Sequence, residues 1–301
     1  MTHPAPDILC IGSALWDIIG RHPGRMAHGQ DVPGRIARIP GGVALNVAVA
    51  LARFGMRPAF LTSLGQDAEG DELARTLTAR GIDCRHAYRD AARPTDAYMA
   101  IEDSQGLVAA VADAHSLEAA GELILAPLSD GRLGSAAAPW TGPVVIDGNL
   151  TEDLLARIAV SPLFARAAVT VVPASPGKAL RLRPLIGMAN ATLHLNRIEA
   201  DALAGRASTD AADAARAILG LGASRVIVTD GANLSADGTA AGIVTARPPA
   251  VPLRRVTGAG DTCLAAHLVA ERRGMDRAAA LAAAVRTAAR HVAGEDPHEP
   301  A

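Results

Sequence analysis

Short apolar runs alternate with longer segments of helical pattern through the second half of the chain. The apolar runs lie at residues 144–146, 169–172, 192–195 and 226–229. Apolar stretches of this length, separated by helix-like segments, are typical of buried strands joined by crossover helices. The pattern therefore predicts an α/β fold, in which a parallel sheet carries helices on both faces.

The first third of the chain contains four further elements with the pattern of a core. They are strands at residues 8–12 and 59–62, and helices at 42–54 and 71–80. The second helix is amphipathic and ends before Gly81, and a glycine in that place is a common helix-stop signal.

Other strands in this third fall outside the strand–helix rhythm. Residues 34–40 alternate polar and apolar, as a half-exposed strand does. The runs 97–101 and 107–111 flank a turn at 104–106 and predict a β-hairpin.

Composition excludes several classes of protein. The 301 residues are half hydrophobic, enough for a sizeable core, but no apolar run approaches the ~20 residues of a membrane span. The start of the chain lacks the basic segment of a signal peptide, so a cytoplasmic protein is expected. A net charge of −2, with two Trp, two Tyr and three Phe, argues against a nucleic acid polymer as partner.

The cysteines and the single lysine exclude further chemistry. Cys10, Cys84 and Cys263 form no CxxC pair, so neither a zinc site nor a disulfide framework is indicated. Cys263 is interpreted as a small buried helix residue and not as a nucleophile. Gly177 and Lys178 are followed by Ala179 where a P-loop needs Ser or Thr, and position 172 is Val where the first P-loop glycine is required. Any phosphate site must therefore be of another kind.

A glycine-rich turn at residues 256–262 (VTGAGDT) precedes an apolar helical run. Free N–H groups at a helix start, together with the helix dipole, attract an anion such as a transferring phosphoryl group. Asp261 lies at the edge of this turn, where its carboxylate could take a proton from an attacking hydroxyl. A plain glycine turn capped by Asp261 is the alternative.

A second glycine pair, Gly41 and Gly42, leads into an alanine-rich helix that carries Asn46 one turn in. Glycines let a ligand approach the backbone closely. In order and spacing, the two glycine segments resemble the two signatures of the ribokinase-like (PfkB) sugar and nucleoside kinases, and the resemblance covers nearly the whole chain. It implies that Gly41, Gly42 and Asn46 hold the substrate.

The same resemblance implies roles for the C-terminal signature and for the fold. Asp261 would be the catalytic base, and the backbone of Gly258, Ala259 and Gly260 would form the anion hole. The fold would be a doubly wound, mostly parallel sheet in one domain over residues 1–301. A small β-sheet lid would be formed by strands within about 31–40 and 84–113, and lids of this kind often serve dimerisation.

Two further segments resemble nucleotide-site motifs of the family. Asn196 and Glu199 match its N-x-x-E motif, which implies an indirect hold on Mg²⁺ through water. A helix N-cap with its capping-box glutamate is the alternative. Thr229 and Gly231 resemble the nucleotide-contacting turn at a strand end. The second glycine usual in that turn is absent from residues 232–234.

Within the family, several segments resemble the pseudouridine kinases. Asp17 matches the aspartate that holds sugar hydroxyls. The other matching substrate-region and cofactor residues are Thr95, Tyr98, Asp113, Asn149 and Lys178. The chain departs from the pattern at Leu15, Ala114, His115, Val172 and Arg255.

The resemblance implies ATP-dependent phosphorylation of the 5′-hydroxyl of a ribosyl substrate, with pseudouridine as first choice. ATP and Mg²⁺ would be cofactors, a monovalent cation could also bind, and a homodimer through the lid is expected. A ribokinase or another sugar or nucleoside kinase is the alternative in the same class. A non-catalytic ligand sensor on the same fold is the alternative from another class, and intact Asp261 argues against it. An oxidoreductase would need a G-x-G-x-x-G after the first strand, which is absent.

Overall fold

A computed structural model describes residues 5–298, and its larger sheet has eight strands. Their order across the sheet is β14 (Gly242–Ala246), β13 (Ser235–Thr239), β12 (Arg225–Thr229), β11 (Ala191–Asn196), β10 (Ala168–Val172), β9 (Pro143–Asp147), β1 (Ile8–Ile11) and β4 (Pro58–Leu61). The pairs from β12 to β4 are parallel, as the apolar runs predict, whereas β13 and β14 add an antiparallel edge.

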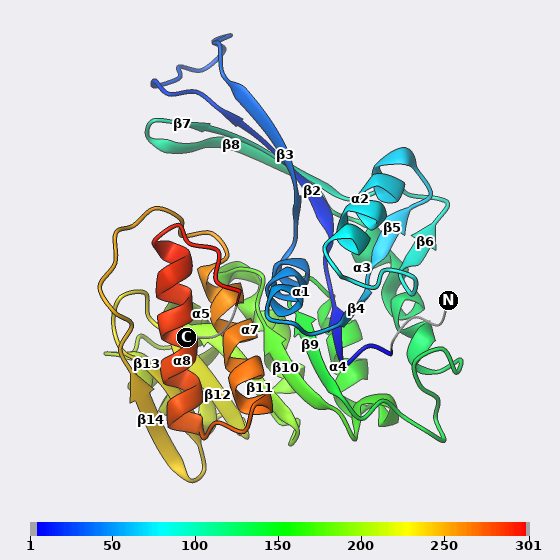
Figure 1. The fold of residues 1–301 in the computed structure, drawn as a ribbon, viewed down its shortest axis with the longest axis vertical. Coiled ribbons are helices and arrows are strands. Elements are labelled where there is room, and N and C mark those ends of the chain that lie inside the picture. The colour runs from blue at the N-terminus through cyan, green and yellow to red at the C-terminus, as the bar shows by residue number, and fades with distance from the viewer. Residues whose placement is uncertain (1–4, 299–301) are drawn as a thin grey trace.

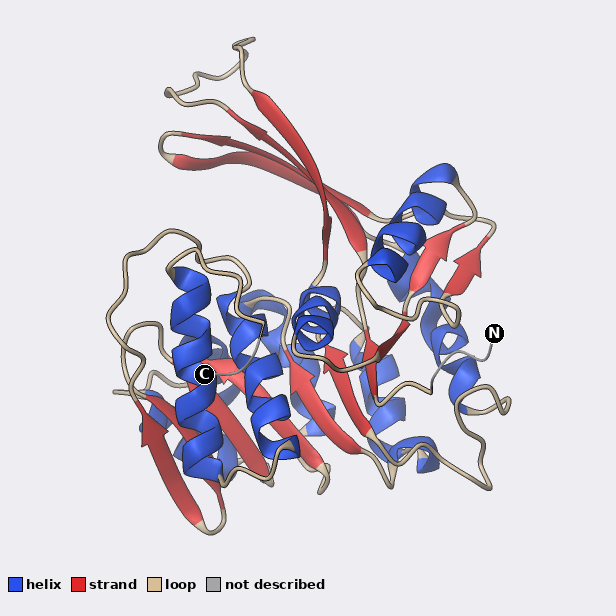
Figure 2. Cartoon of the chain, in the orientation of Figure 1, coloured by secondary structure: helices blue, strands red, loops and turns tan. Residues whose placement is uncertain are grey.

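Helices cover both faces of this sheet (Figure 2). One face packs against α1 (Val43–Arg53), α2 (Ala68–Ala79), α7 (Ala259–Arg272) and α8 (Arg277–Val292). The other face packs against α3 (Ser116–Ala120), α4 (Glu152–Val160), α5 (Arg197–Ala204), α6 (Ala211–Gly220) and the 3₁₀ segments at 121–128, 162–164 and 176–185. Side chains alternate along β1, so Ile8 and Cys10 pack into the core on one face, whereas Leu9 and Ile11 pack into the core on the other.

A second sheet of four strands projects away from the larger one (Figure 1). Its order is β3 (Arg35–Gly41), β2 (Leu15–Arg21), β7 (Ala97–Asp103) and β8 (Gly106–Asp113). β3 and the β7–β8 hairpin match the strands expected at 34–40, 97–101 and 107–111. The pattern missed β2, which carries Asp17 in a strand at the centre of this sheet. We call these four strands the small sheet.

A two-stranded ribbon joins the small sheet to α2. It consists of β5 (Ser63–Gly65) and β6 (Tyr88–Asp90), which pair in parallel. The side chain of Asp67 caps α2 by accepting from the Gly70 N–H at 2.7 Å. No helix among residues 5–298 is both long and apolar enough to cross a membrane.

The chain reverses its direction of strand addition between β1 and β9. From β1 it adds β4 on one side, and it later returns to add β9 on the other. In open α/β sheets a crevice forms at the carboxyl ends of strands where the order reverses, and ligands bind there. The ends of β1 and β9, with the start of α1, therefore mark the place to examine.

Candidate functional site

Asp147 is the fully buried centre of this switch point, at the end of β9. Its carboxylate accepts hydrogen bonds from the Ser13 N–H at 3.0 Å and hydroxyl at 3.1 Å, and from the Ala44 N–H at 3.0 Å. It also accepts from the backbone and side-chain N–H groups of Asn149, at 2.9 and 3.2 Å. One carboxylate thus joins the end of β1, the start of α1 and the end of β9. The sequence marked this strand end but gave Asp147 no role of its own.

The glycine pair before α1 lies against this network. A Cβ on Gly42, whose φ is +118°, would collide with the Ser13 carbonyl, and a Cβ on Gly41 would collide with the Asp17 carboxylate. The φ of Gly42 and its approach to the Ser13 backbone favour glycine there, whereas a side chain at position 41 would displace the Asp17 carboxylate. Burial raises the pKa of Asp17 to about 6. The structure thus brings Gly41, Gly42 and Asp17 together, as the resemblance implies.

Helices α1 and α7, which follow the two glycine segments, pack together. The Asn46 side chain of α1 lies close enough to the half-buried carboxylate of Asp261 to influence its pKa. Burial raises the pKa of Asp261 to about 7, and the negative charges of Asp147 and Glu199 add to the rise, while the Asn46 amide opposes it. A carboxyl group that titrates near neutrality can accept and release a proton at physiological pH.

The expected anion-hole turn forms the start of α7. Gly258 is the N-cap, with a left-handed φ of +83°, and Gly260 is exposed in the first turn. The N–H of Ala259 donates to the Val256 carbonyl at 3.1 Å, so this group is already occupied within the turn. The Gly258 and Gly260 positions are therefore the better placed to meet an anion.

The two nucleotide-site motifs lie next to each other at the carboxyl edge of the sheet. β11 and β12 pair so that Asn196 is opposite Thr229. Asn196 and Glu199 form a complete capping box, because each side chain accepts from the other's backbone N–H, at 2.9 and 2.8 Å. Thr229 donates to the Leu195 carbonyl at 3.5 Å, and Gly231 follows with a φ of +57°.

Glu199 is buried to 8% exposure, and this burial raises the pKa of its carboxyl group. The capping box accounts for its Oε2 atom. Glu199 therefore caps the helix, as the alternative interpretation expects. Its negative charge also contributes to the raised pKa of Asp261.

Lys178 belongs to the same network as Asp147. Its ammonium group donates to Asn149 Oδ1 at 2.7 Å, and Asn149 in turn donates to the Ser13 hydroxyl at 2.8 Å. Arg181, which the sequence analysis did not select, donates to the Asn149 carbonyl at 3.2 Å. The amide of Asn149 is thus held in place from both ends, and Lys178 supplies positive charge beside it.

The structure does not bring Thr95 and Asp113 to Asp17. The buried hydroxyl of Thr95 donates to Asp67 at 2.6 Å, next to the cap of α2. In the small sheet, Asp17 is opposite Tyr98, and Tyr98 is opposite Ala112. Because neighbouring residues of a strand point to opposite faces, Tyr98 shares the face of Asp17, and Asp113 lies on the other face.

Other sites with chemistry of their own would be a cluster of metal-ligating side chains or a reactive thiol. Within residues 5–298, no group of three or more His, Cys, Asp or Glu side chains is arranged to hold a metal ion. Burial raises the pKa of the Cys263 thiol to about 12, so a thiolate nucleophile is disfavoured there.

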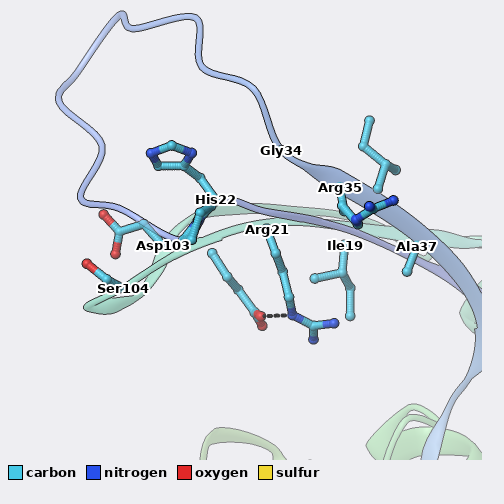
Figure 3. A pocket seen from close by; sticks show the side chains of 11 residues that line it. Ile19, Arg21, His22, Gly34, Arg35, Ala37, Asp103 and Ser104 are labelled. Carbon is cyan, nitrogen blue, oxygen red and sulfur yellow. Dashed lines mark hydrogen bonds and ion pairs between the residues drawn. The ribbon is translucent and has the colours of Figure 1, made fainter.

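A hollow of about 840 Å³ lies at the far end of the small sheet (Figure 3). Its lining includes Arg21, His22, Arg35, Glu102 and Asp103, with an ion pair of 2.7 Å between Arg21 and Glu102. None of the site residues described in this subsection lines the hollow, so it is separate from the Asp261 site.

The fold and the site together define a ribokinase-like kinase, with a large mostly parallel sheet and a smaller sheet beside it. Comparison with known families agrees: residues 5–299 match the pfkB family carbohydrate kinases. The chain belongs to this family, and it is therefore a kinase of the phosphotransferase class.

Three relatives illustrate the similarity. The pseudouridine kinase of Escherichia coli K12 is 28% identical over 271 residues, which are 86% of this chain and 81% of the relative. A carbohydrate kinase from Agrobacterium tumefaciens superposes with a TM-score of 0.79 at 27% identity, covering 95% of this chain and 90% of that one. Arabidopsis thaliana ribokinase, solved with ribose and ATP, has a TM-score of 0.79 at 21% identity, with 99% and 96% covered.

Proposed function

We propose that this kinase transfers the γ-phosphoryl group of ATP to the 5′-hydroxyl of a ribosyl compound, and that pseudouridine is its substrate. The observation that carries the proposal is the packing of α1 against α7 beside Asp261, whose pKa is raised to about 7 and which lies near the Asn46 side chain. The E. coli relative named pseudouridine kinase, similar over 86% of this chain, supports the choice of acceptor.

The transfer balances as an in-line displacement. The 5′-hydroxyl gives its proton to the Asp261 carboxylate while its oxygen forms a bond to the γ-phosphorus. The bond from that phosphorus to the β,γ-bridging oxygen breaks, and ADP leaves. Positive helix-end potential and backbone N–H groups at Gly258 and Gly260 stabilise the negative charge on the transferred group. Positioning and electrostatics supply most of the rate.

Asp17 is assigned to the sugar hydroxyls. Its carboxylate occupies the space that a side chain at Gly41 would take, and its raised pKa reflects the loss of water around it. A buried acceptor of this kind gains from the hydroxyl donors of a ribose. Tyr98 shares its face of the small sheet and is assigned to the base. Thr95 and Asp113, expected near the base, stay predictions of the resemblance.

Glu199 is the residue assigned to Mg²⁺, through water. The residue fits this role because it is buried and carries a charge that the capping box only partly uses. When bound, the ion would neutralise phosphate charge. Lys178, Asn196, Thr229 and Gly231 are assigned to the nucleotide side. A monovalent cation remains a separate expectation of the resemblance.

The substrate proposal is tested by comparing kcat/KM for pseudouridine, uridine, adenosine, ribose and fructose 6-phosphate, with ADP release as the signal. Pseudouridine has a ring N–H that uridine lacks, and a buried acceptor for that N–H would be left unpaired by uridine. We expect pseudouridine to be preferred, and Tyr98→Phe to reduce the preference. Equal use of pseudouridine and uridine would remove the specificity, and use of ribose alone would make the protein a ribokinase.

The small sheet is assigned as a lid and as the contact of a homodimer. Its face opposite Asp17 carries four exposed apolar side chains: Ile36 (80%), Val111 (70%), Met99 (51%) and Ile101 (38%). Apolar side chains gathered on an exposed face favour association. A second copy of the chain supplies the same apolar surface, which makes it a fitting partner.

A further inference from the structure

The turn that begins α7 rests on a histidine from the neighbouring helix α8. His291 lies in the last turn of α8 and is nearly buried, at 7% exposure. Its Nε2 atom is 2.9 Å from the Thr257 carbonyl oxygen. A Cβ placed on Gly258 would come within 3.4 Å of two ring atoms of this imidazole. The ring therefore packs directly beneath the turn that contains Gly258.

The other ring nitrogen shows which tautomer is present. His291 Nδ1 is 3.1 Å from the Arg255 guanidinium and 3.3 Å from the Thr262 hydroxyl. An arginine can only donate, so Nδ1 accepts. In the neutral ring the hydrogen is then on Nε2, which donates to the Thr257 carbonyl.

Arg255 is itself fixed to the end of the chain that follows α8. Its guanidinium donates to the Glu295 carbonyl at 2.7 Å and to Asp296 at 2.8 Å. The backbone N–H groups of Arg254 and Arg255 both donate to the Val292 carbonyl, at 3.0 and 3.1 Å. The segment before the turn is thus held to the end of α8 by backbone and side chain together.

Charged groups around the ring agree with a neutral imidazole. Burial lowers the pKa of His291. The charges of Arg255 and Arg53 lower it further, whereas the hydrogen bond to Thr257 and the charge of Asp296 oppose this. The imidazole consequently stays neutral at pH values where a free histidine begins to protonate.

We propose that His291, held by Arg255, is a positioning residue that aims the Gly258 N–H at the transferring phosphoryl group. In a trans peptide the C=O and the next N–H point in opposite directions. Anchoring the Thr257 carbonyl on the imidazole therefore turns the Gly258 N–H away from it, toward the open side of the turn. This inference rests on the proposed role of the turn as the anion site.

The test compares His291→Phe, which keeps the ring shape without hydrogen bonds, with His291→Gln, which keeps an N–H donor. His267→Phe is the matched control, because His267 is also buried but lies farther along α7, beside Glu271 and Asp237. We expect His291→Phe to lower kcat about 10- to 100-fold, since removal of one oxyanion donor costs about 10²–10³. The acceptor KM should stay within about twofold, because the donor acts on the transferred group.

His291→Gln should recover part of kcat. A kcat for His291→Phe equal to that of His267→Phe, at similar melting temperature, would overturn the proposal, as would equal loss in the Phe and Gln variants. All rates are measured with whichever acceptor the wild-type enzyme uses. If that acceptor is not pseudouridine, only the substrate assignment fails, and the comparison of variants stands.

A second readout needs no activity. Nitrogen-15 NMR of histidine-labelled protein, with His291 assigned by its loss in His291→Gln, reports the tautomer directly. We expect an Nε2–H ring with an accepting Nδ1 at neutral pH. An Nδ1–H tautomer or a protonated ring would contradict the proposal.

Discussion

The surroundings of Asp261 raise its pKa, which suits the proton-accepting role proposed for it. A carboxyl group normally ionises far below neutrality, yet burial and the charges of Asp147 and Glu199 raise this pKa to about 7. The same surroundings that make ionisation costly make the carboxylate a stronger base. The nearby amide of Asn46 limits this rise of the pKa.

The pH profile of turnover follows from this pKa. Asp261 must be ionised to accept the proton, so kcat should fall as pH drops below about 7, by about tenfold per pH unit once the group is mostly protonated. ADP is quantified by chromatography, which avoids the pH dependence of coupling enzymes. A kcat that stays flat to about pH 5.5 would contradict the role of Asp261 as base.

Stability should depend on pH in the opposite sense. The folded-state pKa of Asp261 lies above its ordinary value of 3.8, so the folded protein binds this proton more tightly than the unfolded chain. The resulting stabilisation is complete below the ordinary value and is lost as pH rises through about 7. Since asparagine cannot ionise, the melting temperature of Asp261→Asn should rise relative to that of the wild type between about pH 4 and 7, and the difference should level off above about pH 7. A constant difference would show that the carboxyl group titrates normally.

The strands and helices meet at Asp147, which ties β1, β9 and α1 together through buried hydrogen bonds. In Asp147→Asn, the amide NH₂ would face N–H groups that now donate to the carboxylate. Each hydrogen bond to a charged group that is lost costs about 1.5–3 kcal/mol. We expect a clear fall in melting temperature and in kcat. Asp153→Asn is the control, because Asp153 is an exposed residue at the start of α4 and its ion pair with Arg157 contributes little. Equal melting temperatures in the two variants would remove the structural role of Asp147.

The start of α5 allows cap and metal roles of Glu199 to be separated. Glu199→Gln keeps a side-chain oxygen for the Asn196 N–H, so the capping box and the melting temperature should survive. The lost charge should raise the Mg²⁺ concentration needed for half-maximal turnover. An unchanged Mg²⁺ titration would leave Glu199 as a helix cap alone.

The small sheet projects from the body formed by the larger sheet and its helices, and its proposed association with a second copy can be tested. Ile36→Glu places a charge in the apolar face of the small sheet, and Arg35→Glu places one on the neighbouring position of the same strand, which points to the other face. Light scattering after gel filtration should show a dimer for the wild type and for Arg35→Glu, and a monomer for Ile36→Glu. A monomeric wild type would refute the assigned interface.

The local sequence pattern predicts the elements that are uniformly apolar or that depend on residues close to each other in the sequence. The parallel strands, α1, α2 and the hairpin follow from their own residues. β13 was missed because it contains the fully buried Asp237, whose charge is paired with Arg225 of the neighbouring strand β12 and with Arg277 of α8. β2 was missed because Asp17 and Gly20 interrupt its apolar pattern.

The site shows the same limit. The glycine turns and Asp261 can be predicted from the sequence because each belongs to a short motif of consecutive residues. The roles of Asp147 and His291 depend on partners more than thirty residues away, as with the 134 positions that separate Ser13 from Asp147. Only the folded chain brings these groups together.

Turnover by Asp261→Asn, followed as ADP release with the preferred acceptor, examines the proposed chemistry at its reacting atom. The amide keeps the size of the side chain and its contact with Asn46 but cannot take the proton. We expect kcat to fall by roughly 10²–10⁴, the usual range for loss of a general base, while the acceptor KM changes little. Turnover close to that of the wild type would contradict the mechanism.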